Sequence, residues 1–340
     1  MSLKICLIGC GEHAWKVHGP SLRKYRRLHP ETELAACCDI NRDAALGFAA
    51  RFGFSRSYVD YERMLDCEQP DAVSVLLPPE LIHPVGRVIL SRGIPALLEK
   101  PPGMTQAELE NLATVAEAGG TINQVAFNRR YTAIIRYTHQ RLNDFLPSTS
   151  AFQVNYEMIR FNRWDADFAT TAIHALDTAL FLSRSPYVKA SFDYCEAPGE
   201  AGGVIGATIE ALTQCGTRVH MNFQPVAGVV LERASIHGLE QSMTLDIPVW
   251  GAYDSPGRLR HWHQDRLVHE ISGSELMPGE EMYEQSGFYA ENEAFFESVR
   301  HHRPATPGLR DACQSVALME AFRRRCRGIE FPDQLLSPPR

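Results

Sequence analysis

Residues 1–125 alternate between short apolar runs and longer segments with the spacing of amphipathic helices. The apolar runs have the length of strands and lack polar alternation, which is typical of strands buried on both faces; they lie at 4–8, 33–38, 72–77, 95–98 and 121–127. Helix-length segments separate the runs at 43–52, 80–92 and 105–118, and the last opens with the capping-box pair Thr105 and Glu108. This alternation predicts parallel strands joined by right-handed crossovers, a doubly wound α/β sheet.

After residue 148, apolar and polar positions alternate strictly instead. The run 217–223 places Val219, Met221 and Phe223 on one face, and the run 151–158 does the same with Phe152, Val154, Tyr156 and Met158. Further strand-like runs follow without crossover helices at 188–195, 203–213, 229–237 and 242–249. We therefore expect an α+β region with an open, mostly antiparallel sheet covered on one face, and the chain closes with helical patterns near 279–301 and 308–327.

The change of pattern also suggests a domain boundary. A chain of 340 residues is long for one domain, so two are expected, residues 1–125 and 126–340. The net charge of −7 and the pI near 6.0 argue against a nucleic-acid or acidic-membrane partner. No run approaches the ~18 consecutive apolar residues of a membrane-spanning helix.

Cysteine usage and the first residues bear on the compartment. The nine cysteines are odd in number and contain no C-x-x-C pair, which fits reduced thiols rather than a disulfide framework. The opening "MSLKICLIGCG" enters a strand directly and lacks the apolar segment and cleavage site of a signal peptide. We expect a soluble cytoplasmic protein.

The first predicted strand ends in "GCGEHA", where Gly9, Gly11 and Ala14 satisfy G-x-G-x-x-A. The motif opens a helical segment, and Asp39 closes the second strand, which is the context that dinucleotide binding requires. A pyrophosphate would meet the N–H groups at the helix start. Asp39 would accept hydrogen bonds from the adenosine ribose and repel a 2′-phosphate, which favours NAD over NADP. The alternative is a purely structural glycine turn.

The apolar run at 95–98 stops at Glu99, Lys100 and two prolines. Charges often mark the point where a strand reaches water. In open α/β sheets, however, ligands bind beyond the carboxyl ends of the strands, and Lys100 lies at the same edge as the glycine turn. Its ammonium is therefore expected where the reactive ring of the cofactor lies. Pro101 and Pro102 would restrict the backbone behind it, and a cis peptide bond before one of them is compatible with the sequence.

These residues together resemble the glucose–fructose oxidoreductase / inositol dehydrogenase (Gfo/Idh/MocA) family over nearly the full chain. The matching motifs are "GCGEHA" with Asp39, "LLPPELIH" (76–83), "EKPPG" (99–103), "FNRRY" (127–131), "IHALD" (173–177) and "NEAFFESVRHHRPATP" (292–307). The resemblance implies an N-terminal Rossmann domain and a C-terminal substrate and oligomerisation domain. It also implies hydride transfer between NAD(P) and a hydroxyl carbon of a sugar, cyclitol or related polyol.

The resemblance also assigns roles to residues. The lysine of the E-K-P motif faces the nicotinamide and the reacting hydroxyl, so Lys100 is the expected catalytic cation. The implied cofactor contacts are Gly9, Gly11, Glu12, His13, Ala14, Asp39, Pro78, His83, Glu99 and Lys100. For His83, a helix-capping or packing role is the alternative. Arg130 would hold a substrate hydroxyl or carboxylate, or else form an ion pair.

The segment 168–182 supplies the second part of the expected site. Its apolar stripe at helical spacing comprises Ala169, Ile173, Leu176 and Leu180. Thr170, His174 and Asp177 share a neighbouring face and are expected to meet the substrate. A histidine beside an apolar stripe is usually structural, but His174 matches the family's helix histidine, which implies a general base for the hydroxyl proton.

Here the chain departs from the family pattern. The family usually reads D-x-G-x-H, whereas this chain has Thr170 and Ala172 before the histidine. Asp165, Asp167 or Asp177 could replace the missing carboxylate. Lys100 and His174 favour an NAD-dependent dehydrogenase, while Thr170 favours the alternative, a non-catalytic NAD or sugar sensor of the same fold.

One further cluster raises the question of a metal. "RHWHQD" (260–265) would place His261, His263 and Asp265 on one strand face, a ligand set for a metal. No further ligand is identifiable, and the family needs no metal, so none is expected. The open sheet face of similar proteins packs against a partner subunit, which predicts a homodimer or homotetramer.

Overall fold

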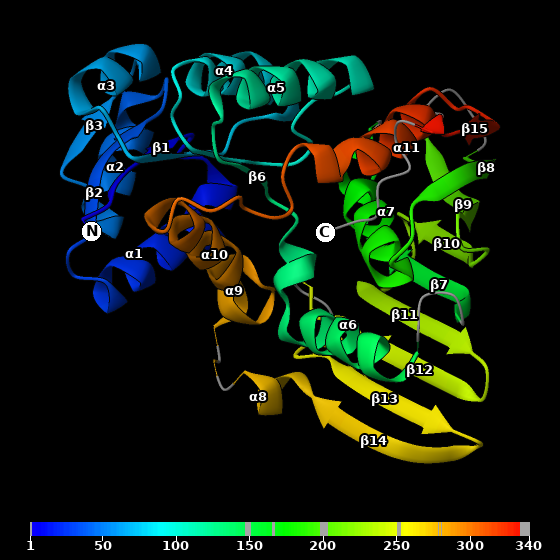
Figure 1. Cartoon of the computed structure of the whole chain (residues 1–340). Helices are drawn as coiled ribbons and strands as arrows, with labels where there is room; N and C mark the ends of the chain where they lie inside the picture. The colour runs from blue at the N-terminus through cyan, green and yellow to red at the C-terminus, as the bar shows by residue number, and fades with distance from the viewer. Residues whose placement is uncertain are drawn as a thin grey trace. The chain divides into compact units, whose positions relative to one another are not determined.

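The computed structural model describes residues 2–146, 151–164, 167–197, 203–249, 253–277, 279 and 281–333. They divide into two compact units (Figure 1). The first comprises Met1–Asn128 and Gly287–Cys313, and the second comprises Arg129–Ser286 and Gln314–Arg340. The predicted domains, 1–125 and 126–340, were continuous, whereas the first unit also includes a segment from near the end of the chain.

The first unit is built on a six-stranded sheet in the order β3-β2-β1-β4-β5-β6. All neighbouring strands are parallel, as the buried apolar runs predicted. The strands are β1 (Lys4–Ile8), β2 (Glu33–Cys38), β3 (Arg56–Tyr58), β4 (Ala72–Val75), β5 (Ala96–Leu98) and β6 (Asn123–Val125). The order reverses at β1, which creates the switch point where doubly wound sheets bind ligands.

Helices follow the strands of this sheet. They are α1 (Gly19–Leu28), α2 (Arg42–Phe52), α3 (Tyr61–Glu68), α4 (Pro79–Ser91) and α5 (Gln106–Gly119), and a short π-helix, η1 (Ala14–His18), precedes α1. Local side chains set several starts, because Asn41 and Asp60 accept N–H groups of the first turns of α2 and α3. Thr105 caps α5 as predicted, but the Glu108 carboxylate accepts the N–H of Met104 instead of that of Thr105.

Helix α10 (Phe288–Arg300) belongs to the first unit and packs against α1. The Tyr25 and Phe296 rings lie 5.0 Å apart, and the Tyr25 hydroxyl donates to Glu297 at 2.9 Å. The helical pattern predicted near 279–301 is interrupted at Gly287, whose φ of +84° separates α9 (Met282–Gln285) from α10. The Tyr25–Glu297 contact joins residues 272 positions apart, so the local sequence pattern could not place α10 in the first unit.

The second unit is built on a nine-stranded sheet in the order β14-β13-β12-β11-β7-β10-β9-β8-β15. Only β7 and β10 pair in parallel; the other pairs described are antiparallel. The strands are β7 (Ala151–Ile159), β8 (Tyr187–Glu196), β9 (Val204–Thr213), β10 (Arg218–Gln224), β11 (Leu231–Gly238), β12 (Gln241–Asp246), β13 (Arg258–His263), β14 (Arg266–Ser272) and β15 (Gly328–Glu330). The predicted open, mostly antiparallel sheet is confirmed.

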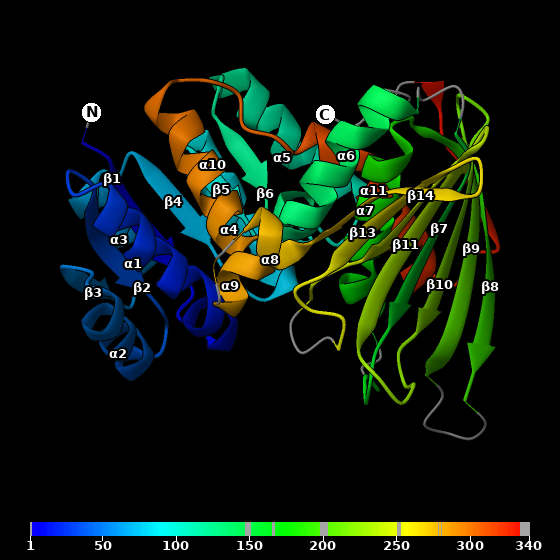
Figure 2. The same cartoon turned by 90° about the horizontal axis from the view of Figure 1, so that it is seen from below.

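One face of this sheet is covered by helices (Figure 2). Helix α7 (Ala169–Ser183) lies along β7 and β10, and α6 (Ala133–Phe145) lies against β13 and the short α8 (Gly273–Leu276). Helix α11 (Cys313–Arg323) is the last helix that the structure describes before β15, after the 3-10 turn η4 (Arg310–Ala312). No helix in the described ranges is both long enough and apolar enough to cross a membrane.

Phe152 is an exception to the predicted alternation along β7. Val154, Tyr156 and Met158 are fully buried, whereas Phe152 is 56% exposed. The register between β11 and β7 shifts at this point, because His237 pairs with Gln153 and the next residue pairs with Ala151. The bulge leaves Phe152 without a cross-strand partner and turns it away from the buried face, so its predicted place in the core is wrong.

Candidate cofactor and active-site residues

The glycine turn after β1 has the geometry that the motif predicts. Gly9 has a φ of +97°, and a Cβ at this position would lie 2.2 Å from the carbonyl oxygen of Leu76, so only glycine fits. A Cβ on Gly11 would meet no atom within 4 Å. The backbone at Gly11 therefore faces open space, and a cofactor phosphate can approach it closely. Ala14 is 1% exposed and packs inside the unit.

Asp39 is fixed beside this turn. One carboxylate oxygen accepts the N–H of Cys10 at 2.8 Å, and the other accepts the N–H of Asn41 at 2.9 Å. The carboxylate thus ties the end of β2 to the glycine turn. Each carboxylate oxygen has two lone pairs, so both can still accept ribose hydroxyls. Glycine turn, helix start and acidic residue together fit a dinucleotide.

Glu99, which follows β5, is a buried carboxylate held by several hydrogen-bond donors. It is 6% exposed. Its Oε1 accepts hydrogen bonds from His13 Nε2 at 3.0 Å and from His18 Nε2 at 3.1 Å, and its Oε2 accepts the N–H of Lys100 at 3.0 Å. Burial alone would raise the pKa of Glu99, but His13 and His18 outweigh burial and hold this pKa well below its usual value.

Sequence reasoning missed His18. Burial lowers its pKa even though the hydrogen bond to Glu99 acts in the opposite direction, so the ring is neutral near pH 7. Histidines five residues apart lie about 140° apart around an α-helix. In the π-helix η1, where the Gly19 N–H bonds to the Ala14 carbonyl, such residues come to the same side. The pair H-x-x-x-x-H was the only local signal.

The remaining cofactor candidates are more exposed. Lys100 is half-buried, and the Lys100–Pro101 peptide bond is cis. Pro78 precedes the first residue of α4. His83 Nε2 lies 3.1 Å from the Asn111 side-chain oxygen, which joins α4 to α5. That contact supports the packing alternative for His83, and its role toward a cofactor stays a prediction.

In the second unit, Arg130 and Asp177 bind each other. Arg130 Nε and Nη2 donate to the two Asp177 oxygens at 2.8 and 2.7 Å, and Ser315 donates to Asp177 at 3.2 Å. Arg130 is 4% exposed and Asp177 is fully buried. The ion-pair alternative for Arg130 is therefore what the geometry shows. The substrate-binding roles of both residues stay predictions.

His174 lies on α7 and is 7% exposed. The Thr170 hydroxyl donates to the Asp167 carbonyl at 2.9 Å, one turn before the histidine. Of the acids that could replace the missing carboxylate, Asp177 is held by Arg130, and Asp167 accepts a hydrogen bond from Arg323 Nε at 2.6 Å. Asp165 lies outside the described residues.

The strand face expected from "RHWHQD" does not form. His261 and His263 lie on β13, but Gln264 and Asp265 form the turn to β14, with φ of 49° and 59°. Two such residues are the signature of a tight hairpin, so the expectation for Asp265 is wrong. Within the described parts of the chain, one group of side chains has donor atoms close enough for a metal, His13, His18 and Glu99, within 4.8 Å of one another.

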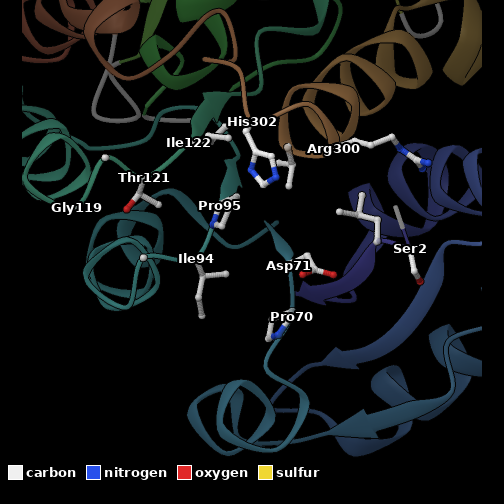
Figure 3. A pocket seen from close by; sticks show the side chains of 14 residues that line it. Ser2, Pro70, Asp71, Ile94, Pro95, Gly119, Thr121, Ile122, Arg300 and His302 are labelled. Carbon is white, nitrogen blue, oxygen red and sulfur yellow. The ribbon is translucent and has the colours of Figure 1, made fainter.

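A hollow of about 390 Å³ lies at the other edge of the six-stranded sheet (Figure 3). It is lined by residues that precede the strands, such as Asp71 before β4, Pro95 before β5 and Thr121 before β6. The glycine turn and Glu99 follow the strands, so this hollow is separate from the candidate cofactor site.

Comparisons with known proteins agree with this geometry. Residues 3–127 match the family GFO_IDH_MocA, described as "Oxidoreductase family, NAD-binding Rossmann fold". D-glucoside 3-dehydrogenase of Escherichia coli (strain K12) is 30% identical over 203 residues, which cover 55% of this chain and 56% of that protein. D-apiose dehydrogenase of Paraburkholderia graminis is 27% identical over 198 residues, 53% of this chain and 49% of the relative. The match thus spans about half the length of these relatives.

The fold is shared over a longer range. A levoglucosan dehydrogenase structure in complex with NADH and L-sorbose superposes with a TM-score of 0.82 at 16% identity, covering 98% of this chain and 99% of that one. At this identity the likeness concerns the fold alone. Residues 3–127 are thus similar to the NAD-binding Rossmann domain of the Gfo/Idh/MocA oxidoreductases.

Proposed function

We propose that the protein is a dehydrogenase that transfers a hydride between NAD and a hydroxyl-bearing carbon of a sugar or related polyol. The contact from His13 to Glu99, at 3.0 Å, carries the proposal. It joins the helix start after the glycine turn directly to the residue before Lys100. The lysine is thereby anchored beside the expected cofactor site. The two curated relatives named above, both sugar dehydrogenases, support the substrate class.

The proposed chemistry is the oxidation of a secondary alcohol. NAD, when bound, accepts the hydride from the carbon. The Lys100 ammonium would orient the hydroxyl oxygen and stabilise the negative charge that develops on it. The hydroxyl proton must pass to a base, and a neutral His174 imidazole has the chemistry to accept it. The carbon then becomes a carbonyl, and two electrons leave with the hydride.

NAD is proposed in preference to NADP. Asp39 is anchored by two backbone N–H groups and so offers a fixed negative charge to the ribose. A 2′-phosphate would meet that charge. Arg42, exposed at the start of α2, is the residue that could offset this repulsion.

A second candidate function, a non-catalytic sensor, is favoured by one observation. Thr170 takes the place of the usual carboxylate, and its hydroxyl donates to the Asp167 carbonyl. A threonine cannot supply the negative charge that stabilises an imidazolium. A protein that kept the cofactor site but lost the proton acceptor would bind NAD without turnover.

An assay at 340 nm, the absorbance band of NADH, separates the two. Purified protein would be incubated with NAD and a panel of free sugars, alkyl glycosides, cyclitols and sugar acids. NADH formation with a sugar or glycoside supports the dehydrogenase. NAD binding by calorimetry without turnover on the panel supports the sensor, and absence of NAD binding contradicts both.

We further propose that the open face of the nine-stranded sheet joins copies of the chain into a homodimer or homotetramer. This face is rich in polar and charged side chains; among them, Glu157 and Arg233 are exposed and Arg260 is partly exposed. A polar sheet face can pair with a second copy through complementary charges. Light scattering coupled to size exclusion would contradict this proposal by giving the mass of a monomer.

A further inference from the structure

The neighbourhood of Glu99 contains two residues to which neither the motifs nor the relatives assign a role. We call His13, His18, Glu99 and Asn292 the Glu99 network. His18 comes from η1, and Asn292 comes from α10 near the other end of the chain. Both are fully buried. The ring of Phe288 packs edge-on against His13 and His18, with centroid distances of 5.4 and 5.8 Å.

Asn292 determines which nitrogen of His18 carries the proton. The Asn292 amide nitrogen donates to the Phe288 carbonyl at 2.8 Å. A carbonyl can only accept, so this bond fixes the orientation of the amide. The same amide nitrogen lies 3.1 Å from His18 Nδ1, closer than the amide oxygen at 3.4 Å, so the shorter contact makes Nδ1 the acceptor. In the neutral ring, Nε2 therefore carries the proton and points it at Glu99.

Glu99 passes this constraint to Lys100. The N–H of Glu99 bonds to the Val75 carbonyl at 3.0 Å, so the backbone of Glu99 is held by the end of β4. The Glu99 carboxylate, held by the histidines, accepts the N–H of Lys100. The peptide units on both sides of Glu99 are thus fixed, which sets the position from which the Lys100 side chain leaves the backbone.

We propose that His18 and Asn292 are positioning residues that hold Lys100 in its catalytic orientation through Glu99. This inference rests on the proposed dehydrogenase function only for the catalytic role of Lys100, because the orientation of the lysine is a property of the structure itself. Displacing a reacting group by about 1 Å can cost on the order of 10²-fold in rate. A buried histidine and a buried amide that keep the flexible lysine in one orientation therefore favour a high rate.

His13, His18 and Glu99 could instead hold a divalent transition metal, because two histidines and a carboxylate are suitable ligands. A histidine that binds metal through Nε2 must carry its proton on Nδ1 and donate it to an acceptor. Here the Asn292 amide nitrogen, a donor held in place by the Phe288 carbonyl, lies 3.1 Å from His18 Nδ1, and the amide oxygen that could accept lies farther away, at 3.4 Å. The surroundings of His18 therefore favour the hydrogen-bonded network over a metal.

The first test needs no enzymatic activity. Nitrogen-15 NMR of histidine-labelled protein should show His18 as the neutral Nε2–H tautomer at pH 7. Hydrogen exchange of the Lys100 amide should be at least about tenfold faster in His18→Leu than in wild type. His18→Gln places an amide N–H near the position of Nε2 and should restore slow exchange. An Nδ1–H tautomer, or unchanged exchange in folded His18→Leu, would overturn the proposal.

The second test uses turnover. We expect kcat to fall by about 10- to 100-fold in His18→Leu, less in Asn292→Leu, and to recover in His18→Gln, with the KM for NAD changed far less than kcat. Gln124→Leu is the matched control: its buried amide also bonds to α10, at the Glu291 carbonyl, 3.1 Å away, but does not touch the network. Equal losses in this control and in His18→Leu would show a merely structural role.

Titration with Zn²⁺ completes the design. One equivalent bound tightly by wild type and lost in both His18→Leu and Glu99→Gln would replace the positioning proposal with a metal site. Absence of such binding supports the network. If wild type turns over no sugar, the proposed function fails, while the NMR and exchange measurements still decide the role of His18 and Asn292.

Discussion

Each unit of the protein buries a motif carboxylate, but the partners of the two carboxylates differ. Glu99 in the first unit is held by two histidines and a backbone N–H, and the side chain of one of these histidines, His13, is 40% exposed. Asp177 in the second unit is held by the bidentate guanidinium of Arg130 and by Ser315. Glu99 thus lies one residue from a surface that a ligand can reach, whereas Asp177 is enclosed.

The difference separates two uses of a buried charge. An arginine stays charged at any pH of interest, so the Arg130–Asp177 pair is permanent and suits a structural role. Histidine donors depend on tautomer and protonation instead, so the hydrogen bonds to Glu99 depend on groups such as Asn292 that fix the tautomer of His18. The motifs alone do not reveal this distinction, because both carboxylates lie in motifs by which the sequence resembles the family.

The largest expected effect is on stability and concerns the second unit. Asp177→Asn keeps the shape but leaves the Arg130 guanidinium buried without its counter-charge, which should cost about 3–5 kcal/mol of unfolding free energy. Guanidinium denaturation followed by circular dichroism would measure the loss. Glu117→Gln is the control, because its pair with Arg310 at 2.7 Å is about half exposed and should contribute at most about 1 kcal/mol. Equal losses of unfolding free energy in the two variants would show that the buried Arg130–Asp177 pair contributes no more to stability than an exposed ion pair.

The second unit contains another buried carboxylate paired with arginines, Glu232, and its contribution to the free energy of unfolding should be lost in acid. Burial alone would raise the pKa of Glu232, but Arg129, Arg160 and Tyr156 lower it to about 2 from 4.5. Because this pKa is lower in the folded state, the contribution of Glu232, about 3 kcal/mol, is complete above pH 4.5 and is lost as the pH falls toward 2. Glu232→Gln should therefore be less stable at pH 7 and lose less further stability on acidification. A parallel acid profile in the variant would contradict this assignment.

Lys100→Met tests the functional side of the comparison. The substitution keeps most of the side-chain volume and removes the charge, so kcat should fall by about 10²-fold, as for the loss of one preorganised donor. NAD affinity and unfolding free energy should change little, because Lys100 lies past the end of β5 and is half-buried. Steady-state kinetics with calorimetric NAD titration measures the split. Comparable losses of binding and turnover would make Lys100 a structural cation.

A smaller effect is expected at Asp39. NAD should bind at least about tenfold more tightly than NADP, roughly 1.4 kcal/mol, because a 2′-phosphate would lie beside the fixed carboxylate. Asp39→Asn keeps an acceptor for the backbone N–H groups and removes the charge, so the preference should shrink. Fluorescence titration with NADH and NADPH measures both constants. Equal affinities in the wild type would refute the assignment and point to Arg42 as a phosphate ligand.

The sequence predicted the elements whose cause is local. Apolar runs located five strands of the first sheet, but the three-residue β3, with exposed or half-exposed side chains, carried no such signal. Gly9 and Asp39 were found because a glycine turn and an acidic strand end are local features of a binding motif. The bulge at Phe152 was missed because it arises from the register with β11, a strand about 80 residues later.

The candidate site was harder to predict for the same reason. His18 reaches Glu99 only because η1 is a π-helix, and Asn292 reaches His18 only because α10 returns to the first unit. The histidine spacing next to the motif does not by itself reveal a π-helix at Ala14–His18, and the position of Asn292 depends on a segment more than 270 residues later. For Arg130, the residues left an ion pair and a substrate contact equally open; the ion pair depends on Asp177, 47 positions away, and the substrate contact stays a prediction. Long-range packing decided these points.

The smallest expected effect is a change in a pH profile, and it probes Thr170, where the sequence departs from the pattern of the family that it resembles. If His174 is the base, the rate of alcohol oxidation rises with pH as the imidazole loses its proton. Thr170→Asp places a carboxylate one helical turn away on α7. Its charge favours the imidazolium, so the rising limb should move to higher pH. His174→Ala should abolish the limb and leave NAD binding intact. A limb that persists in His174→Ala would assign the proton to another group, with Lys100 the first candidate, because it is the cation expected beside the reacting oxygen.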